Sequence, residues 1–268
     1  RVLPLPMMMY ERAGLVANDR FVKPIEWGPA APIARVGIVV DRKMAASLPG
    51  LYACGEALAR QARLEGISSC ATSGAIAGES AAKSLTALGS ATVPASEIKR
   101  LRDYAFAPMQ RKDGIEPGHI VIAVQEAIFP YDVLYLRHES RMQKALEKIE
   151  EIRDNQLPLL FAYDPHYLRV ANEARNMVFV AEAHLKSDMA RKETRTILRE
   201  DYPYEDNANW LKWIDIKNKN GQMELSTRDV PIDKYPLKPR REKQLYYMWS
   251  QAQAIGAIRI EKGEVVWV

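Results

Sequence analysis

The chain has 268 residues, 47% of them hydrophobic and 27% charged, and its formal net charge is +4. This composition is typical of a globular protein with one large or two smaller domains, and so small a charge argues against nucleic-acid binding, which usually needs a dense basic stripe. The two cysteines, Cys54 and Cys70, exclude a disulfide framework, and the lack of a CxxC pair argues against a zinc or iron–sulfur site.

Hydropathy and the start of the chain bear on its location. The sequence contains no run of about 18 apolar residues, so no membrane span is predicted, and no signal peptide is recognisable. The low cysteine content favours a reducing, cytoplasmic setting. The chain begins at Arg1 and enters a stretch rich in Pro and Met, LPLPMMMYERAGL, which we interpret as a cut end.

The first regular elements are predicted between residues 36 and 55. The β-branched run Val36–Asp41 (VGIVVD) predicts a buried strand. Turn chemistry follows at Leu48-Pro49-Gly50, and Leu51–Cys54 (LYAC) predicts a second strand that ends at Gly55. Ligands of open α/β sheets bind at the carboxyl ends of strands, so the next residues are candidates for a binding site.

Gly55 and Glu56 occupy this strand end. A glycine lets a ligand approach the backbone closely, and a carboxylate can accept hydrogen bonds from sugar-like hydroxyls. Taken alone, Gly-Glu after a strand is more often a plain turn. The next segment, residues 68–85, is rich in Ala, Gly and Ser and predicts a helix.

The start of this helix would turn free backbone N–H groups and the positive end of the helix dipole toward a ligand. Such a helix end binds an anionic group. The side chains at this end are Ser68, Ser69, Thr72 and Ser73. Taken alone, a small-residue helix more often reflects close packing than a ligand site.

From Pro94 onward the pattern predicts long amphipathic helices. One begins at Pro117, and another covers residues 139–153, with an apolar stripe of Met142, Leu146, Ile149 and Ile152. Asp164-Pro165 is a strong helix start. The buried face of the helix that follows is predicted to hold Leu168, Ala171, Val178, Ala181 and Leu185.

Two hairpins are predicted near the end of the chain. Residues 210–230 form strands joined at Asn220-Gly221, a dipeptide suited to a tight turn, and Ala257–Val268 turns near Lys262-Gly263. The Pro-, Lys- and Arg-rich segment 231–243 is expected to cross the surface. The four histidines have no metal-ligand spacing, so we expect no metal site.

The order GIVVD, LPGLYACGEA, SS and SGAIAGESAA resembles the second FAD-binding segment of the fumarate reductase and succinate dehydrogenase flavoproteins. In that family the strand-end Glu binds the FAD ribityl chain, which corresponds to Glu56 beside Gly55. The helix start meets the flavin pyrimidine, which corresponds to Ser68 and Ser69. With Thr72 and Ser73 these residues form the predicted cofactor-binding set.

A second match lies at positions 180–213, which resemble the C-terminal helical domain of the same family. The matching motifs read Glu193-Thr194-Arg195, Arg199-Glu200-Asp201-Tyr202-Pro203 and Asn209-Trp210-Leu211. We expect Arg195 and Arg199 to act as structural braces through Glu193, Asp201 and Glu205. The resemblance covers roughly residues 30 to 230.

The sequence departs from succinate dehydrogenases near the substrate region. Pro32 stands where those enzymes carry His, and the short Ala57–Gly66 replaces a longer H-G-A-N-R-L segment whose Arg grips a substrate carboxylate. The length is closer to the adenylylsulfate reductase alpha subunit, which carries His-Lys at the place of Arg63-Leu64. Arg60 and Arg63 are the candidate catalytic residues, because arginine binds a carboxylate or sulfate bidentately; the alternative is that they are solvated loop residues.

The resemblance implies the C-terminal half of a flavoprotein subunit of the succinate dehydrogenase, fumarate reductase and adenylylsulfate reductase superfamily. The implied fold is an α/β FAD-binding domain portion followed by a mainly α-helical C-terminal domain, with residues 1–92 in the former, 93–230 in the latter and 231–268 as a C-terminal extension. No GxGxxG motif occurs, so the adenosine half of FAD lacks its main site here.

The implied function is an FAD-dependent oxidoreductase acting on a small anionic, fumarate- or succinate-like substrate, with electrons passing to a separate iron–sulfur subunit. An adenylylsulfate reductase alpha subunit and a non-catalytic, subunit-docking fragment remain as alternatives. We expect the segment alone to be inactive.

Overall fold

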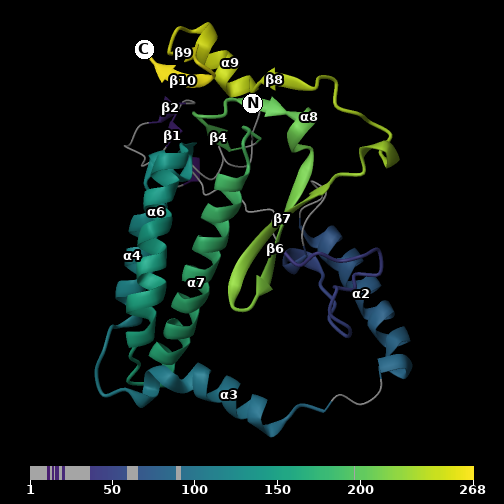
Figure 1. Cartoon of the computed structure of the whole chain (residues 1–268), viewed down its shortest axis with the longest axis vertical. Helices are drawn as coiled ribbons and strands as arrows, with labels where there is room; N and C mark the ends of the chain where they lie inside the picture. The colour runs from purple at the N-terminus through teal and green to yellow at the C-terminus, as the bar shows by residue number, and fades with distance from the viewer. Residues whose placement is uncertain are drawn as a thin grey trace. The chain divides into compact units, whose positions relative to one another are not determined.

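The computed structural model divides the chain into two compact units, Arg1–Ala87 and Leu88–Val268 (Figure 1). Each unit is described by itself. The structure describes residues 11–12, 14, 16–17, 20–21, 37–58, 66–88, 92–195 and 197–268.

The first unit contains one long helix and very little regular sheet. Two-residue strands β1 (Val16–Ala17) and β2 (Arg20–Phe21) pair antiparallel. Between residues 37 and 58 the chain makes only isolated bridges, Ile38 with Leu58, Val40 with Ala46 and Ala45 with Tyr52. The predicted strands at Val36–Asp41 and Leu51–Cys54 are therefore extended segments, and an α/β sheet layout is not formed by the described residues of this unit.

The predicted small-residue helix is present as α2 (Ile67–Leu88). Ala77 and Ser73 are its buried side chains among those described, at 7% and 8% exposure. From residue 37 onward, the described part of the first unit thus consists of a looped segment, a short 3-10 turn η1 (Gly55–Ala57) and this helix.

The second unit is built on three packed helices, α4 (Pro117–Ile128), α6 (Glu139–Glu151) and α7 (Pro165–Ala190) (Figure 1). Pro117 starts α4, and Asp164 caps α7 by accepting the Tyr167 N–H at 2.9 Å, both as predicted. All four residues of the predicted stripe on α6 and its π-helical continuation η3 (Ile152–Gln156) lie in the core: Met142, Leu146, Ile149 and Ile152.

The predicted face of α7 is also largely correct, since Ala171, Val178, Ala181 and Leu185 are buried and Leu168 is half-buried. Helix α3 (Ala95–Phe106) precedes the bundle and buries none of its residues. Its C-terminal carbonyls are bound by α7, because Arg175 donates to Tyr104 O at 2.8 Å and Asn172 donates to Ala105 O at 3.2 Å. Short elements complete the connections: η2 (Ala107–Gln110), α5 (Tyr131–Leu134), β3 (Leu136–Arg137), η4 (Leu157–Leu159) and β4 (Leu198–Arg199).

Small antiparallel pairs follow the bundle. β6 (Lys212–Lys219) and β7 (Gln222–Asp229) form the predicted hairpin, and its turn residues Asn220 and Gly221 have φ values of 54° and 86°. The second predicted hairpin is β9 (Ile258–Glu261) and β10 (Glu264–Trp267). The remaining elements of this region are β5 (Tyr204–Asp206), α8 (Asn207–Trp210), η5 (Ile232–Lys234), β8 (Lys243–Leu245) and α9 (Tyr247–Ala254).

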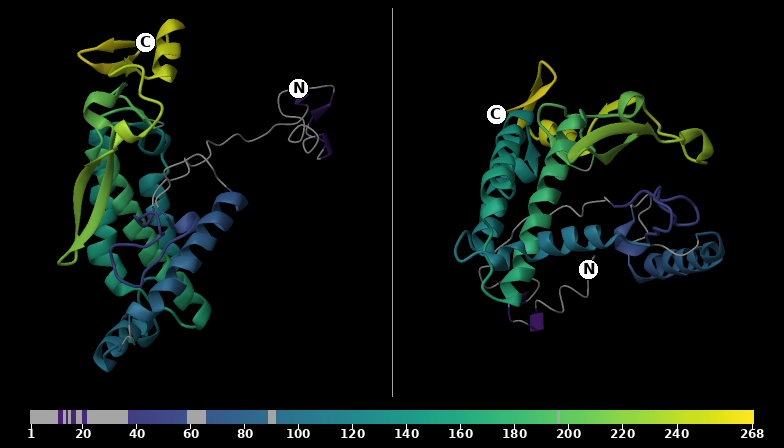
Figure 2. Two further views of the ribbon diagram at one scale, coloured as in Figure 1. Left: turned by 90° about the vertical axis from the view of Figure 1, so that its right-hand side faces the viewer. Right: turned by 60° about the horizontal axis from the view of Figure 1, so that its bottom comes forward.

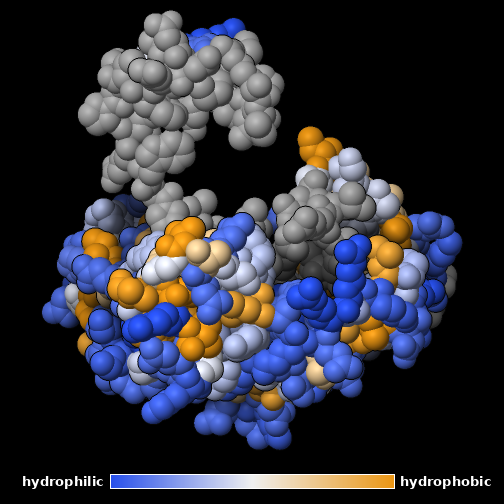
Figure 3. Space-filling view, turned by 90° about the horizontal axis from the view of Figure 1, so that it is seen from above, coloured by the Kyte–Doolittle hydropathy of each residue, from blue (hydrophilic) through white to orange (hydrophobic). Residues whose placement is uncertain are grey.

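α9 and the β9–β10 hairpin lie at one end of the helical bundle in both views of the second unit (Figures 1 and 2). Seen from that end, hydrophilic residues dominate the surface and smaller apolar patches lie among them (Figure 3). The segment 231–242 is almost entirely exposed, as predicted. Within the described part of the chain, no helix combines the length and apolar character needed to cross a membrane.

Candidate functional site

The Gly55-Glu56 turn is the predicted cofactor-binding element of the first unit. The chain arrives in extended conformation at Cys54 and then turns at Gly55, whose φ of +59° is left-handed. A Cβ at this position would lie 3.3 Å from Cys70 Sγ, so the turn needs glycine both for its backbone conformation and for its close approach to α2. The turn is also hydrogen-bonded to an earlier part of the chain, because Ile38 N donates to Ala57 O at 2.8 Å.

Two hydrogen bonds fix this segment along α2. Tyr52 Oη donates to Ser84 Oγ at 2.8 Å, and Gly55 N donates to Ser73 Oγ at 2.9 Å. Because residue 52 meets the later part of the helix and residue 55 its earlier part, the segment runs antiparallel to α2. It therefore delivers the Gly-Glu turn to the N-terminal end of the helix, where free N–H groups and the positive dipole end lie.

The predicted cofactor-binding residues gather at this end. Glu56 and Ser68 are exposed, and Ser69 is half-buried, with its hydroxyl donating to Gly66 O at 3.2 Å. Thr72 donates to Ser68 O at 2.8 Å, and Ser73 is buried. The candidate catalytic residues Arg60 and Arg63 lie outside the described residues.

The chemical groups at this end are compatible with the flavin part of FAD. A Cβ added at Gly74 or Gly78 would meet nothing within 4 Å, so this side of α2 is open to a neighbour. The exposed Glu56 carboxylate suits hydroxyl groups, and the helix start suits an anionic edge. The described residues contain no group of three His, Cys, Asp or Glu side chains that could hold a metal ion.

A buried ionic network is the main polar feature of the second unit. Glu193 is 1% exposed; its carboxylate pairs with Arg191 at 2.6 Å and Arg195 at 2.7 Å and accepts the Asp206 N–H at 2.9 Å. Arg195 also reaches Glu205 at 2.9 Å. These contacts satisfy the carboxylate on all sides, which is what a buried charge requires.

The second predicted brace is also present. Arg199, 2% exposed, binds Asp201 at 2.7 Å and donates to the carbonyl oxygens of Asp188 and Arg191 at 2.6 and 2.9 Å. The predicted ion pairs of Arg195 with Glu193 and Glu205, and of Arg199 with Asp201, are therefore present within the second unit.

The sequence reasoning missed a third cluster, between β3 and α7. Arg137, 1% exposed, pairs with Asp188, and its Nη2 lies 3.1 Å from His184 Nε2. Burial lowers the pKa of His184 below its usual value of 6.5, against the Asp188 carboxylate, which raises it. No sequence signal marked this cluster, because its members are 47 and 51 residues apart in the chain.

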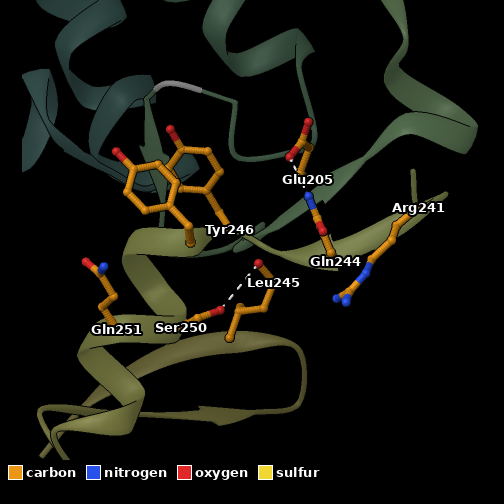
Figure 4. A pocket seen from close by; sticks show the side chains of 8 residues that line it. Glu205, Arg241, Gln244, Leu245, Tyr246, Ser250 and Gln251 are labelled. Atoms are coloured by element: carbon orange, nitrogen blue, oxygen red, sulfur yellow. Dashed lines mark hydrogen bonds between the residues drawn. The ribbon is translucent and has the colours of Figure 1, made fainter. Parts of the chain in front are cut away.

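A shallow hollow lies between the β5–β8 pair and α9 (Figure 4). Glu205 on its floor is already bound by Arg195 and, at 3.0 Å, by Gln244 Nε2, and Ser250 donates to Leu245 O at 3.4 Å. Glu205, Gln244 and Ser250 are thus engaged in contacts within the fold. The residues that line it are Glu205, Arg241, Gln244, Leu245, Tyr246, Tyr247, Ser250 and Gln251.

Part of the second unit matches a known family model. Residues 126–243 match the family described as fumarate reductase flavoprotein C-term. An uncharacterized FAD-dependent oxidoreductase of Methanocaldococcus jannaschii is 29% identical over 212 residues, which are 76% of this chain and 38% of the relative. The chain thus spans little more than a third of that relative's length.

Two solved structures share the fold of the chain. Mycobacterium smegmatis Sdh1, determined in complex with UQ1, matches with a TM-score of 0.63 and 24% identity over 72% of this chain and 34% of that one. A mutant FrdA of Escherichia coli quinol fumarate reductase matches with a TM-score of 0.65 and 22% identity over 77% of this chain and 37% of that one.

Proposed function

We propose that this chain is part of an FAD-dependent oxidoreductase of the fumarate reductase and succinate dehydrogenase flavoprotein family. The match of residues 126–243 to the C-terminal family model and the likeness to an FAD-dependent oxidoreductase support this proposal. The proposed substrate is a small anion of the fumarate or succinate kind. The single observation that carries the cofactor proposal is the Gly55–Ser73 hydrogen bond, because it holds the Gly-Glu turn against the start of α2.

In this proposal, Gly55, Glu56, Ser68, Ser69, Thr72 and Ser73 belong to the cofactor site. The Glu56 carboxylate accepts hydrogen bonds from the hydroxyls of the ribityl chain. The first-turn N–H groups near Ser68 and Ser69 face the pyrimidine edge and stabilise negative charge there. Bound FAD supplies the two-electron exchange with substrate, and the protein supplies binding and orientation.

We assign substrate binding to Arg60 and Arg63. They follow the Gly-Glu turn by four and seven positions, and a guanidinium matches a carboxylate or a sulfate through two parallel hydrogen bonds. The same chemistry would serve adenylylsulfate, so an adenylylsulfate reductase alpha subunit is the alternative within this class.

Electrons are proposed to pass to a separate iron–sulfur subunit. The proposal is supported by the cysteine content, because two cysteines without a CxxC pair supply no ordinary set of cluster ligands within these 268 residues. We further propose a cytoplasmic location and a division of labour in which residues 1–92 serve the FAD-binding domain. The helical residues 93–230 and the extension 231–268 provide the supporting domain.

A second candidate function is structural: a unit that docks subunits and does no chemistry. The observation that favours it is the second unit itself, whose charged side chains Glu193, Arg195 and Arg199 are engaged in ion pairs and hydrogen bonds within the unit.

The full-length polypeptide distinguishes the two functions. Purified protein should be yellow, with flavin absorbance that succinate bleaches or, after chemical reduction, fumarate restores. Adenylylsulfate is tested in parallel, and a response to it alone selects the alternative substrate. A colourless protein that takes up no added FAD would contradict the enzyme and favour the docking role.

A further inference from the structure

Ser73 occupies an unusual position for a residue at a ligand-binding helix end. It lies on the second turn of α2, is 8% exposed, and faces the looped segment of the first unit. Its hydroxyl takes part in three contacts. Oγ accepts the Gly55 N–H at 2.9 Å and lies 2.7 Å from Ser69 O and 3.2 Å from Cys70 O.

These contacts use the hydroxyl's hydrogen. A serine hydroxyl has one hydrogen, and here it is donated into the preceding turn of its own helix, with the shorter distance to Ser69 O. The oxygen then serves as acceptor for Gly55. Ser73 therefore links the carbonyls of the first turn of α2 to the backbone of the Gly-Glu turn.

The turn has little freedom once this link is made. Gly55 is in the left-handed region, and the space where its Cβ would stand is bounded by Cys70 Sγ at 3.3 Å. Glu56 follows directly in η1, so the place of its carboxylate depends on where the Gly55 amide is held. The other anchor, Tyr52 to Ser84, lies eleven residues further along α2 and fixes the opposite end of the segment.

We propose that Ser73 is a positioning residue. It sets the Glu56 carboxylate over the first turn of α2 through the Gly55 amide and does not touch the cofactor itself. The inference rests on the proposed function and sharpens it, because it separates one residue of the predicted cofactor set from those that contact the ligand.

The opposing explanation is general packing, in which Ser73 and Ser84 simply attach a loop to a helix. The two explanations differ in what each serine should affect. Under general packing, loss of either hydroxyl destabilises the unit alike and affects the cofactor alike. Under positioning, only Ser73 should matter for cofactor binding.

The test uses the full-length flavoprotein with Ser73→Ala, the conservative Ser73→Thr, and Ser84→Ala as the matched control on the same helix. Two quantities are measured: the hydrogen-exchange rate of the Gly55 amide in cofactor-free protein, and the FAD dissociation constant by fluorescence titration. Threonine keeps the hydroxyl and can still bond the carbonyl four residues back.

We expect Ser73→Ala to speed Gly55 exchange and to weaken FAD binding about tenfold, which is the effect of losing one hydrogen bond. Ser73→Thr should restore both quantities, and Ser84→Ala should leave both within about twofold of the original protein, well inside the tenfold step. Unchanged Gly55 exchange in Ser73→Ala would overturn the positioning role, and so would equal losses of FAD affinity in both alanine variants.

The exchange measurement needs no cofactor, so it separates the two hypotheses. Suppose that Gly55 exchanges faster in Ser73→Ala than in the original protein, but that no variant binds FAD, the original protein included. The hydrogen bond between Ser73 and Gly55 would then be supported, and the proposed function would be contradicted. This outcome would also remove the role of Ser73 toward the cofactor.

Discussion

The indole Nε1–H of Trp267 donates to the carboxylate of Glu200 at 2.6 Å. The residue next to the end of the chain is therefore joined to the family motif that follows the helical bundle. Val265 N adds a second bond, to Glu200 O at 2.8 Å. Trp249 on α9 lies edge-on to Trp267, with ring centroids 6.2 Å apart. The C-terminal hairpin is thus part of the second compact unit.

Trp249 is the largest fully buried side chain in this region, at 2% exposure, and its Nε1 donates to Thr194 Oγ1 at 3.3 Å. Trp249→Ala should lower the free energy of unfolding by about 3–5 kcal/mol, because a cavity is left in the packed region. Trp267, 51% exposed, serves as the comparison, and Trp267→Phe should cost far less. Urea unfolding followed by circular dichroism measures both; equal effects would contradict the buried packing of Trp249.

Glu193 holds the buried network together. Glu193→Gln removes its charge and leaves Arg195 and Arg191 without their shared partner, so we expect a loss of roughly 3 kcal/mol or more in unfolding free energy. The exposed pair of Glu97 and Arg100 on α3 is the matched control, and Glu97→Gln should leave the free energy of unfolding nearly unchanged. Similar losses for both variants would show that burial does not determine how much these ion pairs contribute to the free energy of unfolding.

The His184 imidazole makes stability depend on pH. Burial lowers the pKa of His184 below 6.5 in the folded protein. At pH values between the folded and unfolded pKa, the unfolded chain therefore binds more protons than the folded one. The free energy of unfolding should therefore fall as the pH drops below about 6.5, and it should be insensitive to this group above that value. His184→Gln should reduce the slope of unfolding free energy against pH just below pH 6.5. An unchanged slope in the variant would place the titration elsewhere.

Gly55 and Gly74 make an informative pair of glycines. Gly55→Ala introduces a Cβ at φ +59° and 3.3 Å from Cys70 Sγ, and should destabilise the first unit by about 1–2 kcal/mol or more. Gly74→Ala meets no neighbour within 4 Å and should stabilise α2 by about 1 kcal/mol. Thermal unfolding of the two variants should shift in opposite directions. A shift in the same direction would contradict the described backbone of the turn.

The sequence predicted the second unit well because its signals are local. The stripe from Met142 to Ile152 follows helical periodicity, and Asp164-Pro165 and Asn220-Gly221 carry capping and turn chemistry that depends on few neighbours. The Arg137 cluster could not be predicted in this way, since its contacts join residues distant in sequence.

The first unit shows the limit of the same reasoning. The β-branched run from Val36 to Asp41 indicates extended, partly buried backbone, yet a strand exists only where a neighbouring strand pairs with it. In the described residues these partners are single bridges. Gly55 and Ser73 were predicted to belong to the same cofactor-binding set. The hydrogen bond that brings them together could not be predicted from the sequence.

In the proposed cofactor site, Glu56 and the start of α2 together hold FAD. The most direct test is FAD titration of the full-length apoprotein with Glu56→Ala and, as control, Glu79→Ala, an exposed glutamate later on the same helix. We expect FAD to bind at least about tenfold more weakly to Glu56→Ala and with unchanged affinity to the Glu79→Ala control. Equal FAD affinity in the original protein and the Glu56 variant would contradict the proposed site.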